Sequence, residues 1–150
     1  CTFTIKSYAQ SAEKMVCRGD VKYDLEHFEN AILDYTLAIA ANPGFDEAFL
    51  KRGNAAFKLH RYKDAMRDYT MAIELNPYNR NAYFNRAIVK TKCRDRDGAL
   101  QDYNACIKLD PYFKDAFLNR CQLIPKSSRL ISTFEQHGEN IVKANGELNP

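Results

Sequence analysis

Apolar side chains recur along most of the chain with the 3.6-residue period of an amphipathic helix. Between residues 28 and 41, for example, one helix face carries Ala31, Ile32, Tyr35, Ala38 and Ile39. The pattern predicts an all-α protein with helices near residues 12–25, 28–41, 46–59, 62–75, 80–93, 96–109 and 114–124. Residues 1–11 show no clear period and are interpreted as an N-terminal flank.

The pattern repeats at a constant interval, which the equally spaced Pro43, Pro77 and Pro111 mark. Each proline ends a helix, because it cannot extend one and disfavours helical backbone in the preceding residue. The chain divides into three helix-pair repeats, 12–45, 46–79 and 80–113, and a final segment, 114–150. We interpret that segment as a partial fourth repeat and a divergent C-terminal cap, in which Pro125 breaks the pattern and residues 128–137 form a short amphipathic helix.

Aligned positions keep their size from repeat to repeat, as close packing between paired helices requires. On the first helices the small position is held by Gly19, Gly53, Ala87 and Cys121. The large position is held by Met15, Phe49, Tyr83 and Phe117. On the second helices the small position is held by Ala31, Ala65 and Ala99, and the large position by Tyr35, Tyr69 and Tyr103. Small residues therefore allow close approach, and large ones fill the space beside them.

Charged residues follow the same spacing. The two sets are Arg18, Arg52, Arg86 and Arg120 on first helices, and Asp34, Asp68 and Asp102 on second helices. We expect each aspartate to pair with an arginine of its own or the next repeat, since a guanidinium fork fits a carboxylate. The alternative is a row of arginines that binds a ligand.

Composition excludes several classes of protein. The 150 residues are 45% hydrophobic and 27% charged, and no apolar run reaches the roughly 20 residues of a membrane helix. The net charge is only +3, and no Lys/Arg stripe alternates with aromatic residues, so we expect no nucleic-acid partner. Five cysteines without Cys-x-x-Cys spacing argue against disulfides and zinc, which indicates a reducing, cytoplasmic setting. Because no Met begins the chain, we expect it to belong to a longer protein.

No catalytic or cofactor site is predicted. His27 and His60 fall in the turns between paired helices and His137 in the final segment, so no two of them are placed to bind a metal or activate a nucleophile. Cys106 and Cys121 replace small packing residues and are expected to be buried and unreactive. We therefore expect neither an enzyme nor a cofactor.

A repeated helix-turn-helix unit of this length, with these size columns and a closing proline, resembles the tetratricopeptide repeat. The resemblance covers residues 12–113 as three repeats and continues into the helix at 114–124. It implies a right-handed α-solenoid of antiparallel helix pairs, in which the first helices line a concave face that binds peptides or helices of other proteins.

The resemblance places the candidate partner-binding residues on the first helices. They are Lys51, Asn54, Lys58, Phe84, Asn85, Ile88, Lys92, Leu118, Asn119 and Gln122. The same face holds Glu13, Val16, Cys17, Asp20, Asp24, Glu47, Leu50, Asn81 and Asp115. Asn54, Asn85 and Asn119 are the strongest candidates, because an amide both donates to and accepts from a peptide backbone. The alternative is a concave face that is merely solvated.

Co-chaperone members of this family, which hold acidic chaperone tails, are similar in repeat number and in Phe84-Asn85-Arg86-Ala87. They clamp two carboxylates with Lys, Asn, Asn, Lys and Arg. Here those places hold Val16, Asp20, Lys51, Asn81 and Asn85, and none matches. A shift by one repeat recovers Asn54 and Asn85 but puts Leu50, Asp115 and Asn119 where the cations belong. Without clustered cations a desolvated carboxylate is poorly compensated, so clamp-type binding is not expected.

These observations favour a protein-protein interaction scaffold that binds a peptide or helix of another protein. Two alternatives stay open: a structural segment of a large assembly, or a clamp-less, co-chaperone-like module that regulates an enzyme elsewhere in the parent chain. An uncapped solenoid end would also allow self-stacking.

Overall fold

The computed structural model describes residues 2–124, which form helices without any strand in that range. The helices are α1 (Thr2–Asp24), α2 (Phe28–Ala41), α3 (Asp46–Lys58), α4 (Tyr62–Leu75), α5 (Arg80–Lys92), α6 (Arg96–Leu109) and α7 (Lys114–Leu123). From α2 onward each boundary lies within one residue of the predicted one. The predicted features at Pro125, 128–137 and His137, and the C-terminal cap, lie outside the described residues.

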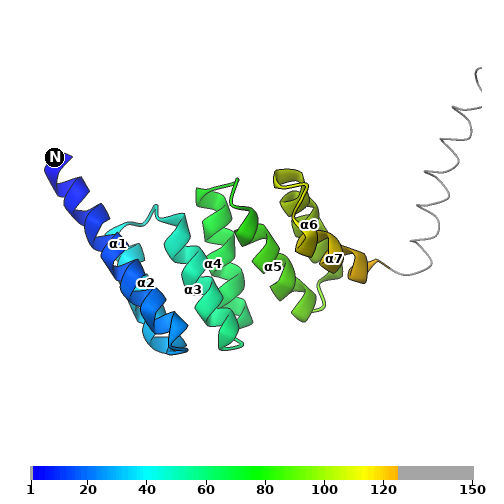
Figure 1. The fold of residues 1–150 in the computed structure, drawn as a ribbon, viewed down its shortest axis with the longest axis horizontal. Helices are drawn as coiled ribbons and strands as arrows, with labels where there is room; N and C mark the ends of the chain where they lie inside the picture. Colours follow the sequence, from blue (N-terminus) through cyan, green and yellow to red (C-terminus); the bar gives the residue numbers. More distant parts are fainter. Residues whose placement is uncertain (1, 125–150) are drawn as a thin grey trace, which may run out of the picture.

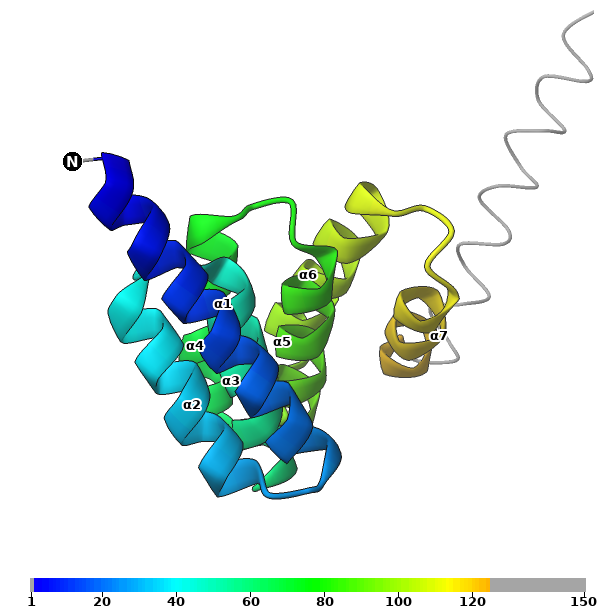
Figure 2. The same cartoon turned by 60° about the vertical axis from the view of Figure 1, so that its left-hand side comes forward.

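The helices are stacked in chain order as antiparallel pairs (Figure 1). α1 pairs with α2, α3 with α4 and α5 with α6, and α7 packs on α6. The first and last described helices therefore lie at opposite ends of the stack (Figure 2). The fold is an all-α solenoid, as the repeating pattern predicts.

The first helix begins much earlier than predicted. α1 starts at Thr2, so residues 2–11 are not a separate flank but the first turns of a 23-residue helix. The pattern missed them because helix extension needs no buried face: each added residue contributes a backbone hydrogen bond once a helix exists. Residues 2–11 contain neither glycine nor proline to stop it.

The three turns between paired helices share one backbone conformation. Glu26, His60 and Arg94 have left-handed φ values of 60°, 58° and 63°. In the first turn the N–H of Glu26 donates to the carbonyl of Tyr23, and that of His27 to Lys22, each at 2.9 Å. This Schellman arrangement satisfies the last helix carbonyls. Because none of the three residues is glycine, each turn carries the steric cost of a side chain at positive φ.

The turn between repeats is closed by a side chain. An oxygen of Asn42, Asn76 or Asp110 accepts from the backbone N–H two residues later, at 3.2, 3.1 and 3.0 Å. The residue between the two partners is the proline that marks the repeat. The Asn-Pro or Asp-Pro phrase thus ends one helix and turns the chain toward the next.

The core of each repeat is a buried tyrosine packed against a small residue. Tyr35, Tyr69 and Tyr103 are at most 2% exposed. A Cβ added at Gly19 would lie 2.5 Å from Cε1 of Tyr35, and one at Gly53 would lie 2.7 Å from Cε1 of Tyr69. Such contacts are too short for carbon atoms, so the small residues are needed where the paired helices approach.

Each buried aspartate is held by an arginine of the same repeat. Arg52 donates to both carboxylate oxygens of Asp68 at 2.8 and 2.7 Å, and Arg86 binds Asp102 in the same way at 2.8 Å. Arg18 donates to Asp34 at 2.5 Å. The three aspartates are 2–4% exposed, so their charges depend on these arginines, together with Lys22 at 2.7 Å from Asp34 and Lys90 at 2.8 Å from Asp102.

The same arginines also join neighbouring repeats. Arg52 donates to Thr36 at 3.2 Å and Arg86 to Thr70 at 3.1 Å, and each threonine belongs to the preceding repeat. The fourth arginine, Arg120, donates to Asn104 at 2.9 Å and contacts no aspartate within residues 2–124. Each guanidinium of the inner repeats therefore bridges three helices.

Of the two cysteines predicted to be buried, one is buried and one is exposed. Cys106 is fully buried, as expected, and burial raises the pKa of its thiol. Cys121 was expected to be buried but is exposed in the described part of the chain. The prediction was wrong because α7 is the last described helix. Cys121 therefore has no paired second helix to pack against within that range.

Replacing Arg94 by glycine is expected to stabilise the protein by about 0.5–1 kcal/mol, because glycine adopts positive φ without steric cost. Urea denaturation measures the change. Lys92→Gly is the matched control: Lys92 lies in the helix two residues earlier, where glycine is expected to destabilise. Equal effects at both positions would contradict this reading of the turn.

Replacing Arg86 by alanine is expected to lower the free energy of unfolding by about 3 kcal/mol, because Asp102 stays buried with only Lys90 as its charge partner. The control is Arg67→Ala, which removes a 67% exposed arginine paired to Asp64 at 3.4 Å and should cost less than about 0.5 kcal/mol. Similar losses in the two variants would show that the paired arginines are not structural.

Candidate functional site

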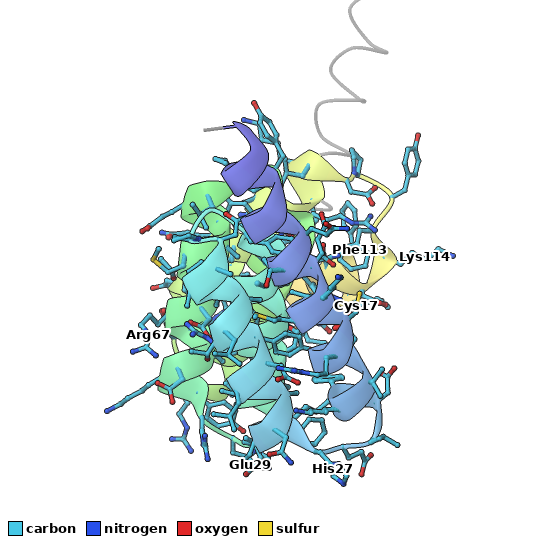
Figure 3. All side chains as sticks on the ribbon, turned by 90° about the vertical axis from the view of Figure 1, so that its left-hand side faces the viewer. Cys17, His27, Glu29, Arg67, Phe113 and Lys114 are labelled. Atoms are coloured by element: carbon cyan, nitrogen blue, oxygen red, sulfur yellow. The ribbon has the colours of Figure 1, made fainter. Side chains whose placement is uncertain are left out.

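The first helices share one side of the stack. Figure 3 shows Cys17 of α1 and Lys114 of α7 on that side, and Arg67 of α4 on the opposite side. Two adjoining pockets open among the side chains of α1, α3 and α5 there. This surface, here called the groove, is the one on which the sequence places the candidate partner-binding residues.

One pocket, here called the amide pocket, has a volume of about 220 Å³. Its lining residues are Tyr23, Asn54, Phe57, Tyr69, Asn85 and Ile88. The second, here called the acidic pocket, has a volume of about 300 Å³ and is lined by Asp20, Tyr23, Asp24, Tyr35, Lys51 and Asn54. Tyr23 and Asn54 belong to both, so the two pockets share a wall.

The amide pocket has unused hydrogen-bonding groups. The side-chain oxygen of Asn54 accepts from the hydroxyl of Tyr69 at 2.9 Å and from Nδ2 of Asn85 at 2.8 Å. Within residues 2–124, Nδ2 of Asn54 and Oδ1 of Asn85 have no hydrogen-bond partner. One donor and one acceptor thus remain beside the apolar side chains of Phe57 and Ile88.

The acidic pocket contains an internal ion pair. Lys51 donates to both oxygens of Asp20, at 3.0 and 2.9 Å, and lies 3.4 Å from Glu47. Burial by itself would lower the pKa of Lys51, but Asp20 and Glu47 outweigh it and the pKa is raised. Tyr35 also donates to Asp20, at 2.9 Å. The charge of Lys51 is therefore already compensated within the protein.

Asp24 is different from Asp20. It is exposed and forms no ion pair among the described residues. Its charge still acts on the pocket: the pKa of Tyr23 is raised first by burial and then by the negative charge of Asp24. Asp24 is thus a carboxylate at the pocket wall without a cationic partner in the described part of the chain.

The structure brings some of the predicted residues together and separates others. Lys51, Asn54, Asn85 and Ile88 line the two pockets. The others lie outside them: Lys58, Lys92, Leu118 and Gln122 are exposed, Asn119 is half-buried, and Phe84 packs against Tyr103 and Phe113.

Sequence reasoning missed two aromatic residues of the groove. Tyr23 lines both pockets and Phe57 lines the amide pocket. A signal existed, because the two lie exactly one repeat apart on successive first helices. Val16, in contrast, was expected on the groove but is 5% exposed and belongs to the core, because its side chain fills space between helices.

Other kinds of site find no support in residues 2–124. No group of three or more His, Cys, Asp or Glu side chains is placed there to hold a metal ion. None of the described helices combines the length and apolar character needed to cross a membrane.

Family models of the tetratricopeptide repeat match residues 47–79 and 81–113. No curated protein matches the chain.

Several solved structures share the fold. The first TPR domain of Spaghetti (RPAP3), bound to the HSP90 peptide SRMEEVD, is 24% identical with a TM-score of 0.76, over 82% of this chain and 95% of that one. The second TPR domain of human RPAP3, in complex with the HSP70 peptide SGPTIEEVD, is 27% identical with a TM-score of 0.73, over 81% and 99%. The Arabidopsis OM64 TPR domain is 24% identical with a TM-score of 0.76, over 77% and 96%.

The matched repeats fall at the same period as the turns, the buried tyrosines and the arginine–aspartate pairs. Residues 47–79 and 81–113 are therefore tetratricopeptide repeats, and the described helices share the fold of that family.

Proposed function

We propose that this chain is a non-enzymatic adaptor that binds a peptide or helix of another protein in its concave groove. The observation that carries the proposal is the amide pocket, where Nδ2 of Asn54 and Oδ1 of Asn85 are left without a partner among the described residues, beside an apolar wall. A peptide bond offers the complementary acceptor and donor, and an adjacent apolar side chain would fill the space between Phe57 and Ile88.

The arrangement also favours an ordered site. Asn54 is fixed by the hydroxyl of Tyr69, whose ring is 1% exposed in the core, and Asn85 is fixed by Asn54. A binding group held in this way loses little conformational entropy when a partner binds. The free amide groups would therefore contribute more to affinity than those of a mobile asparagine.

Two similar domains support a protein partner, since their structures hold HSP90 and HSP70 peptides. In this chain, however, the five places of the two-carboxylate clamp include Val16 in the core and Asp20 bonded to Lys51. We infer a peptide-binding module without clamp-type recognition.

A second candidate function is stacking within a larger assembly, favoured by the apolar end of the solenoid. Val21 is 60% exposed, whereas Ala55 and Val89, in the same column of the next two repeats, are fully buried. Leu33 and Leu37 are also exposed, on the adjoining helix α2. A neighbouring helix covering this end would bury all three residues.

Selection from a phage-displayed library of random 12-residue peptides tests the groove. Peptides selected on the native chain are expected to bind at least tenfold more weakly to Asn85→Ala, because about 1.4 kcal/mol is lost with the amide contact. Fluorescence anisotropy with synthetic peptides measures these affinities.

Arg67→Ala, on the opposite side of the stack, is the control and should leave the affinity unchanged. Arg86→Ala is expected to lower stability more than binding. If the peptides bind Asn85→Ala normally and lose affinity for Arg67→Ala, the groove is not the binding site. In that case sedimentation of Leu37→Lys against the native chain would test stacking.

A further inference from the structure

We propose that the groove selects peptides in which a lysine or arginine lies next to an apolar side chain, with the basic group in the acidic pocket beside Asp24. The apolar side chain would lie in the amide pocket. This inference rests on the proposed function and specifies the chemistry of its partner.

The position of Asp24 is the first argument. It is the last residue of α1, where exposed carbonyls give the helix end a partial negative charge. A carboxylate there is unfavourable. The equivalent last residues of α3 and α5 are Lys58 and Lys92, whose positive charges suit a helix end. Asp24 thus breaks a local rule that the other repeats obey, and such exceptions are expected at functional sites.

The charge balance of the concave face is the second argument. Its carboxylates, Glu13, Asp20, Asp24, Glu47 and Asp115, outnumber its ammonium groups, Lys51, Lys58, Lys92 and Lys114, although the whole chain has a net charge of +3. Among the residues that line the acidic pocket the only ammonium group is Lys51, which Asp20 and Glu47 already compensate. The pocket therefore attracts a cation and repels an acidic peptide.

The shape of the pockets is the third argument. Because they share Tyr23 and Asn54, neighbouring side chains of one peptide can occupy both. The ring of Tyr23 is held by an edge contact with Phe28, at a centroid distance of 5.2 Å. An aromatic wall beside a carboxylate suits a long basic side chain, since the alkyl part contacts the ring and the charged end reaches the carboxylate.

The test is peptide selection on three forms of the 150-residue chain: native, Asp24→Asn and Asp24→Lys. Native protein is expected to enrich 12-residue peptides with Lys or Arg next to an apolar residue. Asp24→Asn should lose most of this enrichment, and Asp24→Lys should select against basic residues. Asp97→Asn, which makes the same change of charge in the first turn of α6, is the matched control and should select like the native chain.

A double-mutant cycle then tests the contact directly. Replacing the basic residue of the strongest selected peptide by Gln should weaken binding to native protein at least tenfold. The same replacement should change binding to Asp24→Asn less than about twofold, because the partner charge is already gone. Raising the salt concentration should weaken only the native combination.

Stability separates this effect from misfolding. Asp24→Asn removes an unfavourable charge from a helix end and should raise the Tm by about 1–4 °C while basic-peptide binding is lost. A lower Tm would contradict the role given to Asp24.

The outcomes distinguish the two proposals. Groove-dependent peptides without a basic residue, or basic peptides that bind Asp24→Asn normally, would overturn this inference and leave the proposed function standing. Selected peptides that ignore Asn85→Ala, or no selected peptides at all, would overturn both.

Discussion

A buried carboxylate must be compensated, and the solenoid depends on how this chain meets that requirement. Asp68 and Asp102 lie on second helices with almost no exposure, and each receives both prongs of a guanidinium from the paired first helix. The fork fixes the distance and rotation of the two helices, since only one arrangement satisfies both oxygens. The same guanidinium reaches a threonine of the preceding repeat, so one ionic group sets the geometry within and between repeats.

The groove is connected to the core through the tyrosines. Tyr35 and Tyr69 bury their rings against glycines, and their hydroxyls donate to Asp20 and Asn54 on the groove. A tyrosine hydroxyl is protonated at neutral pH, and burial raises the pKa of both hydroxyls further, so both act as donors. The polar floor of the groove is thus oriented by the most rigid part of each repeat, which is the support that a preorganised binding site needs.

Periodicity in the sequence was sufficient to predict the repeats, because proline, glycine and tyrosine each have a steric role that recurs at the repeat spacing. Periodicity failed to predict the structure where a segment has no buried face or no packed neighbour. The start of α1 was missed because a helix can extend without a buried face, and Cys121 was misjudged because its column lacks a packed second helix in the described range. Periodicity also assigns a face only approximately, which is why Val16 was placed on the groove and Tyr23 was overlooked.

The ends of the first helices give the groove a polarity. Asp24, Lys58 and Lys92 occupy the same place on α1, α3 and α5, so the charge along this edge changes sign after the first repeat. A bound peptide with a basic residue at one end and an acidic residue at the other would meet opposite charges in one orientation and like charges in the reverse orientation. For a chain bound as proposed, this edge would distinguish its direction as well as its composition.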